Sequence, residues 1–184
     1  MNNKMKLKIQ TLPHYDLDNW GLPSYGSEGA AGFDLRAALH TGQKEALREL
    51  FEKSNANGYS IIKTKTKGDK NATKLNIPSG FVGIIPTGIC IEIPQGCELQ
   101  IRSRSGMGMF GSLVIAHGTG TIDSDYRGEI LIGLRNMNLT TRVIRRGACI
   151  AQAILAPVYR AEWEQTTTLT ETQRGQNGFG STGL

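Results

Sequence analysis

Short apolar runs separated by turn residues dominate this chain and predict a mostly β protein. The first run, Leu7–Leu12, alternates apolar and polar residues as a half-buried strand does, and Pro13 ends it. A second strand is expected at Ala31–Ala37, after a glycine-rich turn. Further short strands are predicted at residues 81–85, 89–93, 98–102, 113–116, 130–134, 142–144 and 149–155. This series of short strands and regular turns favours a sandwich or a jelly-roll-like barrel.

Residues 39–74 interrupt the β pattern. Within them, residues 44–53 place apolar side chains at i, i+3 and i+4, which predicts a helix of roughly three turns. Residues 59–74 carry alternating lysines followed by Gly-Asp-Lys, as in an exposed hairpin. At the other end, residues 166–184 have few apolar side chains and predict a mobile arm unless something docks it.

The composition indicates a globular protein of one domain, or one domain with an appendage. Of its 184 residues, 39% are apolar and 20% are charged. The chain has no apolar run of about 18 residues and no apolar signal at its start, so no membrane partner is expected. Cys90, Cys97 and Cys149 are an odd number without a CxxC pair, which favours free thiols and a cytoplasmic location.

The net charge of +5 is concentrated in one segment. Residues 39–74 hold eight Lys and Arg against four Asp and Glu, whereas the rest of the chain is nearly balanced. The Lys63–Lys74 hairpin is therefore a candidate contact for an acidic partner or a nucleic acid. A tolerated surface appendage is the alternative interpretation.

The segment Gly118–Glu129 carries the first candidate chemistry. Gly118 and Gly120 frame a tight turn, and Asp123 and Tyr126 follow it. A turn with exposed amides, a carboxylate and a flat ring can hold a nucleobase, a water molecule and a sugar together. A hairpin loop followed by an acidic turn explains the same residues without a ligand.

Arg102–Met107 is a second candidate site. Arginine forks, a hydroxyl and a glycine that lets backbone amides approach suit a polyphosphate, although an edge strand ending in a turn has the same residues. The adjoining Gly106–Gly111 matches GxGxxG, but residues 112–118 are too short and too β-branched for the helix of a dinucleotide site. We treat this match as accidental.

The C-terminal Arg174–Gly183 combines an arginine, several glycines, one aromatic ring and two hydroxyls. It is either a linker or an arm that closes over a ligand, stacking its ring and gripping phosphate. No Walker motif or zinc-deaminase signature occurs, and the three histidines are far apart in the sequence. A triad of Ser105, His117 and Asp123 lacks a nucleophile elbow.

Five segments together resemble the motifs of the trimeric deoxyuridine triphosphate diphosphatases (dUTPases), in the family's order. They are Ala31–Ala37, Arg104–Gly106, Gly118–Glu129, Arg146–Gln152 and Arg174–Gly183. The resemblance implies an all-β fold, a jelly-roll-like β-barrel subunit of a homotrimer, with an inserted α-helix and basic hairpin near residues 39–74. It also implies a jelly-roll domain over residues 1–165 and a flexible arm over residues 166–184 that closes over the active site.

The same resemblance implies hydrolysis of dUTP to dUMP and pyrophosphate, which limits uracil in DNA and supplies dUMP for dTMP synthesis. Asp123 would orient and deprotonate the water that attacks the α-phosphorus. Mg²⁺ is expected on the substrate phosphates and waters, with no direct protein ligand. Three chains would build each site: one gives the third motif, a neighbour gives the first, second and fourth, and the third chain gives the fifth.

The resemblance also assigns the substrate contacts. The glycine turn would read uracil, the tyrosine would lie under the deoxyribose and exclude a 2′-OH, and the second motif would hold the α and β phosphates. The arm would stack on uracil and clamp the γ-phosphate. The uracil residues are Gly118, Thr119 and Gly120, and the deoxyribose residue is Tyr126. The α and β phosphate residues are Arg104, Ser105 and Gly106, with Gln152 beside them, and the arm residues are Arg174, Phe179, Gly180, Ser181 and Thr182. Asp34 would act behind them, near the metal waters or a phosphate-binding arginine.

Two departures from the family pattern stand out. Asn177 replaces a usual glycine, and because Asn tolerates positive φ, arm closure is expected to survive. Residues 39–74 replace a short connection and are expected to lie outside the barrel. Two other functions stay open: a dCTP deaminase or bifunctional relative with the same trimeric fold, and a binding or regulatory protein that acts through Lys63–Lys74.

Overall fold

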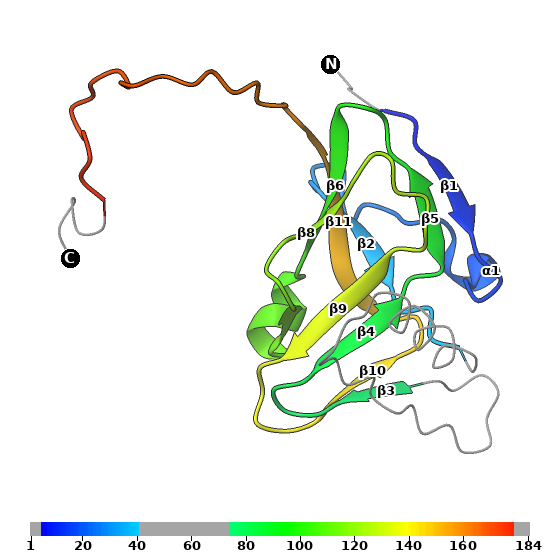
Figure 1. Cartoon of the computed structure of the whole chain (residues 1–184). Helices are drawn as coiled ribbons and strands as arrows, with labels where there is room; N and C mark the ends of the chain where they lie inside the picture. The colour runs from blue at the N-terminus through cyan, green and yellow to red at the C-terminus, as the bar shows by residue number, and fades with distance from the viewer. Residues whose placement is uncertain (1–4, 41–73, 179–184) are drawn as a thin grey trace, which may run out of the picture.

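The computed structural model describes residues 5–40 and 74–178, which form a jelly-roll-like β-barrel with a long C-terminal extension (Figure 1). The elements in chain order are β1 (Lys8–Thr11), α1 (Leu17–Trp20), β2 (Phe33–Arg36), β3 (Lys74–Ile77), β4 (Val82–Pro86), β5 (Ile89–Glu92), β6 (Cys97–Arg102), the π-helical turn η1 (Gly106–Phe110), β7 (Leu113–Ile115), β8 (Gly120–Ile122), β9 (Leu131–Asn136), β10 (Arg142–Arg145) and β11 (Cys149–Pro157). The all-β architecture predicted from the apolar pattern is confirmed.

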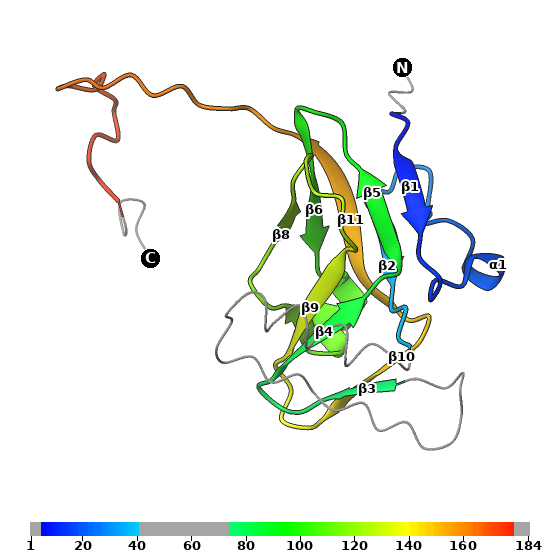
Figure 2. The same ribbon diagram turned by 45° about the vertical axis from the view of Figure 1, so that its right-hand side comes forward.

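Antiparallel pairing joins these strands into four sheets within the described ranges, in the orders β2-β11-β6-β8, β4-β9-β7, β1-β5 and β10-β3. The long strand β11 lies between β2 and β6, as Figure 2 shows from a second side. Its register sets Gln152 opposite Asp34 on β2 and opposite Arg102 on β6. The first, third and fourth motif segments contribute β2, β8 and β11 to this one sheet, and the second motif follows β6.

Isoleucine and leucine side chains from all four sheets fill the barrel interior. The largest fully buried apolar side chains are Leu35, Leu39, Ile77, Ile85, Ile89, Leu99, Ile130, Ile132, Leu134 and Ile150. Burial of each such side chain contributes roughly 1.5–3 kcal/mol relative to exposure. This core fixes the strands from which the motif loops project.

Four elements were not expected from the sequence: β3, β8, α1 and the π-helical turn η1. β3 begins at Lys74, which the sequence pattern assigns to the end of the basic hairpin, and it pairs with β10 because Leu75 and Ile77 alternate into the core. β8 lies where a glycine turn was expected, and it pairs with β6. The short helix α1 is capped by Asp16, whose carboxylate accepts the backbone N–H of Asn19.

The predicted inserted helix and most of the basic hairpin lie outside the described residues, and so does the Lys63–Lys74 contact except for Lys74. The margins of residues 39–74 belong to the barrel. Leu39 is fully buried, and Lys74 is paired with Arg145 in the β3–β10 sheet. Residue 39 at one end and residue 74 at the other are therefore corrected from insertion to barrel.

The chain after β11 leaves the barrel. Residues 158–178 have no regular secondary structure and are exposed, and in Figures 1 and 2 they extend away from the strands. The division into a domain of residues 1–165 and an arm of residues 166–184 remains a prediction. In the part of the chain that the structure describes, no helix has the length and apolar character needed to cross a membrane.

Candidate functional site

A cavity of about 260 Å³ lies beside the start of β2, the end of β6 and the middle of β11. Its lining includes Asp34, Arg104, Ser105, Gly106 and Gln152, together with the glycine-rich segment before β2. The backbone leaves β6 at Arg102 and turns into η1, so the arginine, the hydroxyl and the glycine follow one another along the cavity wall. The structure thus brings together five residues that the sequence assigned to phosphate binding or its support.

An ion pair orders the arginine of this cavity. The Nε of Arg104 lies 2.8 Å from Oδ1 of Asp34, and its Nη1 donates to the carbonyl of Cys149 at 3.2 Å. Both side chains of the pair are about one-third exposed. The guanidinium is therefore held on two sides while the cavity stays open to an anion, and bidentate arginine geometry suits phosphate.

The Cys149 thiol stays protonated beside this pair. Burial has the largest effect and raises the pKa of Cys149; the cations of Arg36 and Arg104 lower it, and the carboxylate of Asp34 raises it through charge and a hydrogen bond. The thiol is thus a neutral neighbour of the Asp34–Arg104 cavity rather than a nucleophile.

Asp123 lies elsewhere on the same subunit. It follows β8 and lines a second, larger cavity of about 840 Å³ with Ser124, Asp125, Arg127 and Arg160. The described chain therefore places the candidate general base and the phosphate residues in two separate cavities. A triad of Ser105, His117 and Asp123 is accordingly not assembled in one cavity.

Tyr126 is held by a tight turn. Its backbone N–H donates to the Asp123 carbonyl at 3.2 Å, and its hydroxyl donates to the Glu129 carbonyl at 2.9 Å. Burial raises the pKa of Tyr126, and the nearby Cys90 and Glu129 raise it further, so the phenol keeps its proton. The ring is still 43% exposed and so presents a free face.

The glycine turn before β8 has the conformation that the sequence predicts. Gly118 has φ of +88°, and its N–H donates to the Ile115 carbonyl at 3.1 Å. Gly118 and Thr119 are exposed, whereas Gly120 is buried opposite Ile101 of β6. The turn thus projects from a fixed strand pair.

Arg174, which belongs to the described part of the arm, lines neither of these two cavities. The Nε of Arg174 donates to the Asn177 carbonyl at 2.9 Å on the exposed extension. Phe179, Gly180, Ser181 and Thr182 lie outside the described residues. The formal GxGxxG match forms η1 and is followed by β7 rather than by a long helix.

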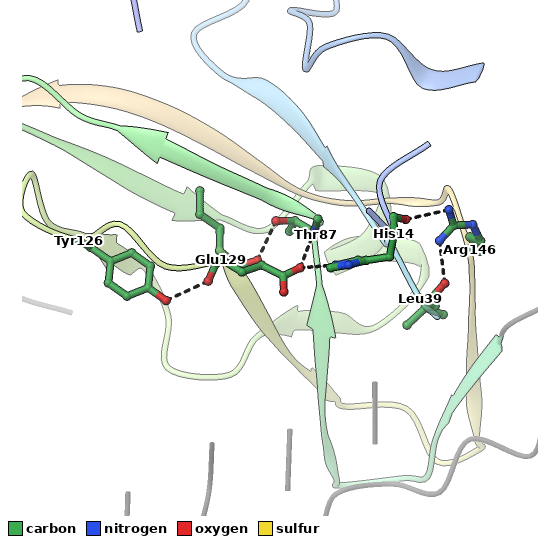
Figure 3. Close-up of polar contacts among 8 residues, drawn as sticks. His14, Leu39, Thr87, Tyr126, Glu129 and Arg146 are labelled. Carbon is green, nitrogen blue, oxygen red and sulfur yellow. Dashed lines mark hydrogen bonds and ion pairs between the residues drawn. The ribbon is translucent and has the colours of Figure 1, made fainter. Parts of the chain in front are cut away.

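The sequence reasoning missed one polar network at the end of the third motif. The Glu129 carboxylate accepts from the Gly88 N–H at 2.6 Å and pairs with His14 at 2.8 Å (Figure 3). His14 also lies against His40, with ring centroids 4.3 Å apart. The sequence signal for this network was Glu129, a charged residue at the end of the third motif. Its partner His14 lies 115 positions away along the chain, so the sequence alone did not pair them.

Comparison with known proteins identifies relatives of the whole chain. The family model of dUTPase matches residues 70–183. A deoxyuridine 5′-triphosphate nucleotidohydrolase from Rickettsia felis is 37% identical over 179 residues, covering 97% of each chain.

Solved structures show the same fold. A mutant dUTPase of Staphylococcus bacteriophage 80alpha, determined with dUpNHpp, superimposes with a TM-score of 0.72 at 20% identity, covering 98% of this chain and 100% of that one. A mutant dUTPase of Staphylococcus aureus phage phi11, whose structure concerns a structural Mg(II) ion, gives a TM-score of 0.65 at 18% identity over 91% of this chain and 100% of that one.

Proposed function

Because this chain belongs to the dUTPase family and is a dUTP diphosphatase, we propose that Asp123 launches the hydrolytic attack on dUTP. Its carboxylate accepts a proton from water as the water oxygen bonds to the α-phosphorus. The bond from that phosphorus to the α–β bridging oxygen breaks, and pyrophosphate leaves with the electron pair. The products are dUMP and pyrophosphate; removing dUTP limits uracil in DNA, and dUMP feeds dTMP synthesis.

The remaining groups bind and orient the nucleotide. Arg104, Ser105 and Gly106 hold the α and β phosphates, and Gln152 places phosphate or water. The exposed turn of Gly118 and Thr119, with Gly120, reads uracil. Two observations support the phosphate-binding roles. Arg104, Ser105, Gly106 and Gln152 line one cavity, and the ion pair with Asp34 orients the Arg104 guanidinium.

The exposed ring of Tyr126 lies against the deoxyribose and leaves no space for a 2′-OH. The arm supplies Phe179 for stacking on uracil and Arg174, Gly180, Ser181 and Thr182 for the γ-phosphate. An arm of this kind completes a site only after substrate arrives and excludes water from it.

Magnesium fits the donor set of the phosphate cavity. Within residues 5–40 and 74–178, no cluster of three or more His, Cys, Asp or Glu side chains could hold a metal ion. The cavity has one carboxylate, Asp34, beside the phosphate-binding Arg104. This donor set suits an ion that keeps its waters and binds mainly to the substrate phosphates. When bound, Mg²⁺ spreads the triphosphate charge and so reduces repulsion of the attacking oxygen.

We propose a homotrimer in which neighbouring subunits complete each site. The observation that carries this proposal is the separation of Asp123 and the phosphate residues into two cavities of one chain. The exposed arm, which extends away from its own barrel, points the same way. The free cysteines of the described chain fit a reducing cytoplasm.

A complementation assay tests the shared site. Subunits carrying Asp123→Asn are mixed and reassembled with subunits carrying Arg104→Ala, each inactive alone. Random assembly leaves up to about a quarter of the sites intact when the two residues come from different chains of a closed ring. No recovery in verified mixed trimers would contradict the shared site.

Product analysis tests the reaction itself. Pyrophosphate release is measured with Mg²⁺ on dUTP, UTP, dTTP and dCTP, and dUTP should be strongly preferred. Release of a uracil nucleotide from dCTP would instead indicate the deaminase alternative.

A further inference from the structure

We propose that Glu129 is a positioning residue that sets sugar selectivity by fixing the ring of Tyr126, an inference that rests on the proposed role of Tyr126 at the deoxyribose. The acceptor of the tyrosine hydroxyl is the Glu129 backbone carbonyl, at 2.9 Å. Whatever fixes the backbone of Glu129 therefore also fixes the far end of the ring (Figure 3).

The Glu129 side chain is anchored on the side away from the tyrosine. Its Oε1 accepts from the backbone N–H of Gly88 at 2.6 Å and from Nε2 of His14 at 2.8 Å. The side chains of Glu129 and His14 are only 21% and 16% exposed. Hydrogen bonds to an ionised carboxylate in such a site are shorter and stronger than neutral ones.

The anchor is itself immobilised by other loops. Arg146 donates from Nη2 to the His14 carbonyl at 2.8 Å and from Nη1 to the Leu39 carbonyl at 2.7 Å. The guanidinium of Arg146 also lies over the ring of Trp20, 4.8 Å from its centroid. The histidine is therefore held from the β10–β11 turn and from the chain after β2.

The backbone beyond Glu129 is fixed as well. The hydroxyl of Thr87 donates to the Ile130 carbonyl at 2.7 Å, and the Ile130 N–H donates to the Ile89 carbonyl at 3.0 Å. Both ends of the Glu129 peptide are thus tied to the β4–β5 turn and β5. The hydrogen bond from the Tyr126 hydroxyl to the Glu129 carbonyl therefore attaches the ring to a fixed stretch of backbone.

Rigid placement matters more for UTP than for dUTP. A ring that blocks a hydroxyl discriminates only while it cannot shift by the width of that hydroxyl. Loosening Glu129 should therefore raise the kcat/KM of UTP relative to dUTP, whereas a purely structural defect lowers both together.

The test is the ratio of kcat/KM for dUTP over UTP in full-length variants that keep wild-type assembly. Glu129→Ala removes both anchors and should lower this ratio about tenfold, equivalent to about 1.4 kcal/mol. Glu129→Gln retains a carbonyl oxygen for the Gly88 N–H and should restore most of the ratio. Glu162→Ala, at an exposed glutamate beyond β11, is the matched control and should equal wild type.

Two further variants keep the test decisive. If Glu129→Ala is too unstable to assay, His14→Leu removes one anchor and should lower the ratio in the same direction but less. A wild-type ratio in these variants, while Tyr126→Ala lowers it, overturns the inference and leaves the proposed function standing. An unchanged ratio in Tyr126→Ala as well removes the sugar role of Tyr126, and the inference falls with it.

Discussion

Replacing Gly128 by alanine should displace Tyr126 from its hydrogen bond. A Cβ on Gly128 would lie 2.5 Å from the hydroxyl oxygen of Tyr126 and 2.7 Å from its Cζ, closer than non-bonded heavy atoms pack. The backbone itself accepts alanine, because Gly128 is not among the positive-φ residues. The ring must therefore turn away, and its 2.9 Å bond to the Glu129 carbonyl is lost.

The expected magnitude follows from that bond. A net hydrogen bond contributes about 0.5–1.5 kcal/mol, so the selectivity ratio for dUTP over UTP should fall roughly 2- to 13-fold. Crowding costs a further 1–3 kcal/mol or so in unfolding free energy unless the exposed ring swings into solvent. The lower end of this unfolding cost is expected, because the ring of Tyr126 is 43% exposed and can move into solvent.

The assay compares steady-state kcat/KM on both nucleotides with urea unfolding of the same preparation. Gly133→Ala is the matched control, since its Cβ would meet the nearest atom at an ordinary 3.6 Å. Equal selectivity in Gly128→Ala and wild type, with both proteins fully folded, would refute the reasoning that this glycine makes room for the ring.

Four other outcomes are expected. Asp123→Asn should keep dUTP binding by calorimetry and lose at least about nine-tenths of kcat, and more residual activity would exclude it as the general base. Truncation after Gln173 should preserve assembly by sedimentation yet lower kcat/KM at least about tenfold. Burial, His14 and Arg146 together lower the pKa of His40 against the opposing effect of Glu129, so as the pH falls through the ordinary value of about 6.5 the unfolded chain binds more protons than the folded one. Between pH 7.5 and 5.5 wild type should therefore lose more stability than His40→Gln, measured by urea titration. Replacing residues 41–73 by a short Gly-Ser linker should leave kcat within about twofold; a large loss in an intact assembly would assign that segment a part in catalysis.

Local pattern predicted the strands whose side chains alternate into the core, and it failed where local signals conflict. Leu75 and Ile77 lie between a lysine-rich stretch and Pro78, so β3 resembled the end of a hairpin. β8 resembled a turn because Gly120 and Thr121 have weak apolar character. In both cases pairing with a distant strand decided the structure, which is a tertiary effect that propensity cannot report.

The candidate site divides in the same way. Motif order pointed to Arg104 and Asp123 because each belongs to a short contiguous segment. The ion pair of Glu129 with His14 joins residues 115 positions apart, and His14 belongs to none of the five motif segments. Such contacts depend on how loops from β1 and β9 pack together, and no local spacing encodes that packing.

The residues on both sides of the segment 41–73 are held by the barrel. The Ala38 N–H donates to the Pro86 carbonyl at 2.8 Å, Arg146 holds the Leu39 carbonyl, and Lys74 enters β3 in register with β10. For a flexible loop between two fixed ends, each doubling of the loop length adds only about 0.6 kcal/mol of closure free energy. Residues 41–73 are therefore a suitable place to insert an affinity tag or a fluorescent reporter without disturbing the barrel that carries the candidate site.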